Sequence, residues 1–129
     1  MRKVLCLSVV LALLPAAAYA TDWVKIGGSP TGVTVYYDRD SATYKEAEVD
    51  AWARIVYPKA QPLSGGGEAA ELRTHYDIDC MARTISSIGV EFYDAGGTLV
   101  RSVVPDPKPE AINMQTPGGA IGKLYCQNW

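Results

Sequence analysis

Apolar and polar residues alternate with a period of two over most of the chain after residue 20, a pattern typical of strands with one buried face. The segment from Glu68 to Cys80 shows it most clearly, because Leu72, Thr74, Tyr76, Ile78 and Cys80 share one face and Arg73, His75, Asp77 and Asp79 share the other. Turn-forming residues separate such segments. The sequence predicts six strands: residues 22–26, 33–37, 48–57, 68–80, 83–93 and 98–104.

The C-terminal region has a helical pattern. Thr116-Pro117 matches a capping residue followed by proline at the first helical position. A short helix over residues 117–125 would turn Ile121, Leu124 and Tyr125 towards the sheet, although three glycines in that range disfavour helix. We therefore expect an α+β fold, an antiparallel sheet of about six strands with a short C-terminal helix.

The first twenty residues have the organisation of a secretory signal peptide. Arg2 and Lys3 precede an apolar run over residues 4–14, and Ala18-Tyr19-Ala20 provides small residues for cleavage. A membrane-spanning helix is the alternative, but it needs about 20 apolar residues. We expect residues 1–20 to be the signal peptide and residues 21–129 to form a single domain. Cys6 lies near the beginning of the apolar run, whereas a lipid-bearing cysteine would follow it.

Composition and charge exclude several classes of protein. Twelve basic and fourteen acidic residues give the 129-residue chain a net charge of −2, with no basic excess for binding nucleic acid. One histidine and the lack of a Cys-x-x-Cys pair argue against a zinc site. After residue 20 no apolar stretch is long enough to span a membrane. We expect no metal, no cofactor and no transmembrane segment.

Two cysteines remain after the predicted cleavage, Cys80 and Cys126. In an exported protein two cysteines usually form a disulfide, and two free thiols are the alternative. If they pair, the bond closes a loop of nearly fifty residues. Such a loop corresponds to about 4 kcal/mol of stabilisation in the chain-entropy treatment.

Catalytic motifs are sparse. His75, the only histidine, shares the polar face of its strand with Asp77, yet no nucleophile motif such as G-x-S-x-G accompanies them. A solvated surface histidine is the favoured interpretation. We expect no catalytic residues and a protein that is not an enzyme, with a site around His75 and Asp77 as the alternative.

Tyrosine and tryptophan are the more informative residues. The chain has eight Tyr and three Trp but one Phe, and Tyr and Trp are enriched at recognition surfaces. The alternative is that strands favour aromatic residues in any case. Trp52 lies on the same strand face as Arg54, and Arg73 and His75 share the polar face of their strand. We select Trp52, Arg54, Arg73 and His75 as the candidate protein-binding residues.

Several short motifs occur together in a characteristic order. They are Trp23-Val24, residues 36–41 (YYDRDS), residues 49–52 (VDAW), Asp79-Cys80, residues 93–97 (YDAGG) and residues 116–118 (TPG) before Cys126. In this order the chain resembles the surface-adhesin protein E family of exported bacterial proteins. The resemblance implies a small antiparallel sheet packed with helix and a disulfide between Cys80 and Cys126.

The resemblance also implies a function. The type member binds host matrix and serum proteins such as laminin, vitronectin and plasminogen, and it can form a homodimer. It is lipid-anchored, whereas this signal lacks a lipid-attachment motif. We expect an exported protein-binding module, located in the periplasm or at the outer cell surface. The alternative is a soluble periplasmic accessory protein of the same fold that binds envelope proteins.

Overall fold

The computed structural model describes residues 21–28 and 30–127. The predicted signal peptide, residues 1–20, lies outside the described residues. The elements are β1 (Trp23–Gly28), β2 (Thr34–Asp38), β3 (Thr43–Lys45), β4 (Glu48–Pro62), β5 (Glu68–Asp79), β6 (Thr84–Tyr93), β7 (Leu99–Val103), β8 (Glu110–Ala111) and α1 (Pro117–Tyr125).

All pairings in the sheet are antiparallel, in the order β1-β2-β4-β5-β6-β7. These are the six predicted strands, but β3 pairs with β4 and β8 pairs with β6. Within the described residues the sheet therefore has eight strands, and the predicted number of six is wrong. The two missed strands span three and two residues. Segments this short carry no readable alternation, and main-chain pairing to a neighbouring strand defines them.

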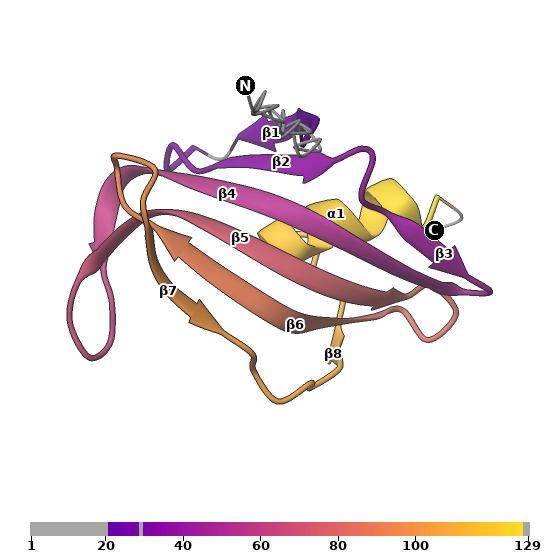
Figure 1. The fold of residues 1–129 in the computed structure, drawn as a ribbon. Helices are drawn as coiled ribbons and strands as arrows, with labels where there is room; N and C mark the ends of the chain where they lie inside the picture. The colour runs from indigo at the N-terminus through magenta and orange to yellow at the C-terminus, as the bar shows by residue number, and fades with distance from the viewer. Residues whose placement is uncertain (1–20, 29, 128–129) are drawn as a thin grey trace, which may run out of the picture.

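The short helix α1 packs against one face of the sheet (Figure 1). On β4 the buried residues are Val49, Ala51, Ala53 and Ile55, as the alternating pattern predicts. Ile78 on β5 and Ile121 on α1 are both fully buried in the same cluster. The small side chains of Ala51 and Ala53 allow the helix to lie close to β4.

The helix begins and ends where the sequence predicts. Thr116 has extended backbone angles, and its hydroxyl accepts a hydrogen bond from the backbone N–H of Gly119 at 3.1 Å. At the other end Cys126 forms a disulfide with Cys80, 46 residues earlier in the chain. The bond fixes the C-terminal end of α1 to the end of β5. This confirms an antiparallel sheet with a short, disulfide-linked C-terminal helix.

Candidate functional site

Aromatic and charged side chains gather on the sheet face opposite α1. Strand register places them side by side, since Trp52 pairs with His75, Arg54 pairs with both Tyr36 and Arg73, and Glu71 pairs with Tyr93. We call this surface the aromatic–cation face. It consists of Trp23, Tyr36, Trp52, Arg54, Glu71, Arg73, His75 and Tyr93.

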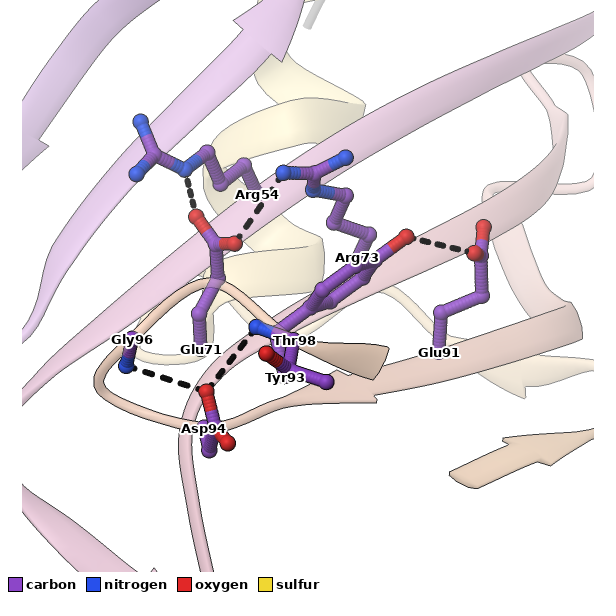
Figure 2. A network of polar contacts seen from close by, with 8 residues as sticks. All are labelled: Arg54, Glu71, Arg73, Glu91, Tyr93, Asp94, Gly96 and Thr98. Carbon is purple, nitrogen blue, oxygen red and sulfur yellow. Dashed lines mark hydrogen bonds and ion pairs between the residues drawn. The ribbon is translucent and has the colours of Figure 1, made fainter. Parts of the chain in front are cut away.

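One buried carboxylate organises the centre of this face. Arg54 and Arg73 are directly opposite each other on β4 and β5, an arrangement in which like charges repel. Glu71, only 7% exposed, forms ion pairs with both guanidinium groups, at 3.2 Å from its Oε2 to the Nη2 of Arg73. Figure 2 shows this carboxylate between the two arginines. Glu71 thereby holds two cations together at a partly exposed surface.

The arginines also lie over aromatic rings. The guanidinium carbon of Arg73 is 4.1 Å from the ring centre of Tyr93 and 5.7 Å from that of Trp23, and Arg54 is 5.1 Å from that of Tyr36. Such cation–π contacts contribute roughly 0.5–1 kcal/mol each at exposed sites. They hold the guanidinium planes in defined orientations.

A hairpin fixes Tyr93 beneath Arg73. The Oδ1 of Asp94 accepts backbone hydrogen bonds from Gly96 and Thr98, both at 2.9 Å, and these close the turn between β6 and β7 (Figure 2). The hydroxyl of Tyr93 donates a 2.7 Å hydrogen bond to Glu91. Burial and then this hydrogen bond to a carboxylate raise the pKa of Tyr93.

Trp52 and His75 form a second cluster on the same face. Their rings stack with centres 4.7 Å apart and planes 9° from parallel, and the Nε2 of His75 contacts the carboxylate of Asp50. The His75 side chain is 26% exposed. The predicted surface histidine is therefore only partly solvated, because Trp52 covers one side of its ring and Asp50 contacts its Nε2.

The structure brings the four predicted site residues together. Trp52, Arg54, Arg73 and His75 occupy adjacent positions on β4 and β5. Sequence reasoning did not select Glu71 or the rings of Trp23, Tyr36 and Tyr93. Glu71 lies two residues before Arg73, so strand alternation would have found it. The three aromatic residues come from other strands, and only the pairing register of those strands places them on this face.

This arrangement offers planar cations, aromatic faces and hydrogen-bond donors, which are the groups that recur at protein recognition sites. Within the described ranges 21–28 and 30–127, no group of three or more His, Cys, Asp or Glu side chains could hold a metal ion.

The sequence profile of the family described as surface-adhesin protein E matches residues 23–127. The chain belongs to the surface-adhesin protein E family. The match spans every strand and the helix, and it includes both cysteines of the disulfide. No curated protein sequence matches the chain.

Solved structures of Haemophilus influenzae protein E have the same fold. One is 15% identical with a TM-score of 0.58, and the match covers 91% of this chain and 92% of that chain. A protein E structure from non-typeable H. influenzae has the same identity and TM-score over 90% and 82% of the two chains. Crystal form II has 14% identity and a TM-score of 0.55 over 74% and 81%.

The protein is thus a surface adhesin-like member of the adhesin E family, with the family's fold. The family is described as a surface adhesin, which indicates an exported or surface-exposed protein with protein partners. No helix in the part of the chain that the structure describes is long and apolar enough to cross a membrane.

Proposed function

We propose that this protein is an exported, non-enzymatic, cofactor-free binding module that recognises a protein ligand through its aromatic–cation face. Residues 1–20 act as the signal peptide and residues 21–129 form one adhesin E-like domain. The ligand belongs to the host extracellular-matrix or serum proteins. Trp52, Arg54, Arg73 and His75 form the contact surface.

The aromatic–cation face is the observation that carries this proposal. Trp52 and His75 are stacked, and Arg73 is held by both Glu71 and Tyr93. These side chains are already ordered before a partner arrives. Ordered aromatic and arginine side chains lose little conformational entropy on binding, which favours affinity. The opposite face is partly occupied by α1 and the core, whereas no helix of the described residues covers this one.

Trp52→Ala tests the proposal. Binding of immobilised laminin, vitronectin and plasminogen is measured by surface plasmon resonance, with folding checked by circular dichroism and thermal unfolding. Loss of a central aromatic residue should weaken binding at least tenfold, in line with an interface hot spot. Tyr44→Ala is the control, because Tyr44 is 67% exposed and lies on β3, outside the aromatic–cation face. Equal binding by wild type and Trp52→Ala would refute the assignment of Trp52.

A soluble periplasmic accessory protein that binds envelope partners is the second candidate. It is motivated by the position of Cys6, which lies near the beginning of the apolar run, whereas a lipid-bearing cysteine would follow that run. Protease treatment of intact cells distinguishes the two. Digestion of the protein on intact cells would support display at the surface, whereas protection until the outer membrane is opened would support the periplasmic function.

We also propose that the protein forms a homodimer. β7 is an edge strand whose Leu99, Val100 and Val103 are 39–49% exposed, and exposed apolar edges pair readily with other strands. Light scattering of the purified protein should give twice the chain mass, and Val103→Lys should reduce it to the mass of one chain. A single-chain mass for the wild type at high concentration would contradict a dimer.

The enzyme alternative has a direct test. The structure pairs His75 with Asp50, on the neighbouring strand, while Asp77 lies two residues further along β5. Hydrolase screening of the wild type and His75→Ala should show no difference. An activity lost in His75→Ala would overturn the non-enzymatic proposal.

A further inference from the structure

The α1 side of the sheet contains an open cavity that the helix does not fill. Its volume is about 460 Å³, and it lies between the strands β1, β2 and β4 and the segment that leads into α1. Ile26, Val33, Ile55, Tyr57 and Met114 form its apolar wall. The described residues that line it carry no charge.

A second cavity of about 490 Å³ adjoins the first. The two share Ile55, Thr116 and Pro117 in their linings, so they lie side by side at the beginning of α1 and together make up one groove. The second cavity differs in its lining, which includes Asp106, Lys108 and Glu110. The groove therefore has an uncharged end and a charged end. We call it the helix-side groove, and it lies on the opposite sheet face from the aromatic–cation face.

The fold explains why the groove stays open. α1 has nine residues and packs on β4 near Ala51 and Ala53, so it covers one end of the long strands and leaves the region around Ile55 and Leu72. Gly27 lines the uncharged cavity, and a Cβ built there would meet nothing within 4 Å. A side chain at this position would occupy the groove.

We propose that the helix-side groove binds an amphiphile with a single acyl chain and a zwitterionic head group. Each cavity falls within the range of roughly 300–1,000 Å³ that is typical of sites for small organic ligands. The uncharged cavity suits a hydrocarbon tail, because burying apolar surface there costs no ion its hydration.

The charges at the other end select the head group. Lys108 lies between Asp106 and Glu110 in sequence, and all three are exposed. A simple carboxylate would meet one ammonium and two carboxylates, which disfavours it. A head group with both a phosphate and an ammonium pairs its anion with Lys108 and its cation with the acidic residues.

Two single-residue variants of β1 test the groove. Gly27→Leu places a side chain in the uncharged cavity, while Lys25→Leu places the same side chain at the strand position paired with Tyr36, on the opposite sheet face. Lauroyl lysophosphatidylethanolamine is titrated into the purified protein below its critical micelle concentration and followed by isothermal titration calorimetry. We expect saturable binding of one lipid per chain, at least tenfold weaker in Gly27→Leu and unchanged in Lys25→Leu.

Laurate tests the head group. We expect it to bind at least tenfold more weakly than the zwitterionic lipid, and Lys108→Ala should reduce that preference. Circular dichroism and thermal unfolding confirm that each variant is folded. No saturable binding, equal weakening in the two leucine variants, or equal affinity for laurate and the zwitterionic lipid would overturn the proposal.

Discussion

Gly119, in the first turn of α1, is expected to be the least replaceable glycine of the helix. A Cβ built on it would lie 1.8 Å from the carbonyl oxygen of Asn113 and 2.8 Å from the Cα of Met114, both backbone atoms. Alanine at an ordinary helix position stabilises by about 1 kcal/mol relative to glycine. At Gly119 the clash with the backbone of Asn113 and Met114 should outweigh this gain, because backbone atoms cannot rotate away as a side chain can.

The size of the destabilisation depends on the backbone that a side chain at residue 119 would displace, mainly the carbonyl group of Asn113. The carbonyl oxygen of Asn113 accepts hydrogen bonds from the backbone N–H of Thr116 at 3.0 Å and from its hydroxyl at 2.7 Å. Displacing Asn113 weakens both, at about 1 kcal/mol each. Overpacking adds roughly 1–3 kcal/mol. We expect Gly119→Ala to lower the free energy of unfolding by about 3 kcal/mol.

Gly118→Ala is the matched control. The nearest atom to its built Cβ is Cδ1 of Ile85 at 3.4 Å, the end of a side chain that can adjust. Urea unfolding of the oxidised proteins, followed by fluorescence, should place Gly118→Ala within about 1 kcal/mol of wild type. Wild-type stability in Gly119→Ala, or an equal loss in both variants, would refute the argument from close backbone approach.

Three further predictions concern stability. Cys80→Ser should lower the free energy of unfolding by about 4 kcal/mol, because the disulfide joins residues 46 positions apart. An identical urea midpoint for the wild type with and without reductant would contradict this. Glu71→Gln should lower the free energy of unfolding, measured with urea, by roughly 3 kcal/mol, since it removes the charge with which both arginines pair. The control Glu91→Gln, at a half-buried position, should lower it by less than about 1 kcal/mol. Equal losses in the two variants would count against a stabilising role of the Glu71 ion pairs. Burial and, second, the nearby Tyr44 raise the pKa of Tyr125 to about 12. In the unfolded chain this hydroxyl ionises at lower pH than in the folded protein, so the stability of the wild type should fall between pH 10 and 12. Tyr125→Phe should be at least as stable as wild type at pH 7 and lose less stability over that pH range, and identical pH profiles would exclude this cause.

The strands were predictable to the extent that their side chains alternate. Each of the six predicted strands corresponds to a strand of the structure, and the helix bounds agree. β3 and β8 were missed because their residues are exposed and their pairing depends on main-chain hydrogen bonds to β4 and β6. Such strands form wherever a neighbour supplies an edge, whatever their own side chains are.

The candidate site was partly visible in the sequence. Alternation placed Arg73 and His75 on one face of their strand, and Trp52 and Arg54 on one face of the strand before it. That the two faces coincide is a matter of register, which pairs Trp52 with His75. The buried carboxylate of Glu71 and its two ion pairs follow from that register.

The sequence by itself determined the local elements, because the period of the apolar positions and the capping Thr116 act over a few residues. Only the tertiary structure decided which distant residues meet, since strand register and helix docking depend on contacts across the whole sheet. The glycines of α1 show the difference. In sequence they disfavour a helix, yet in the fold Gly119 lets the helix lie against the backbone of Asn113, where any side chain would collide.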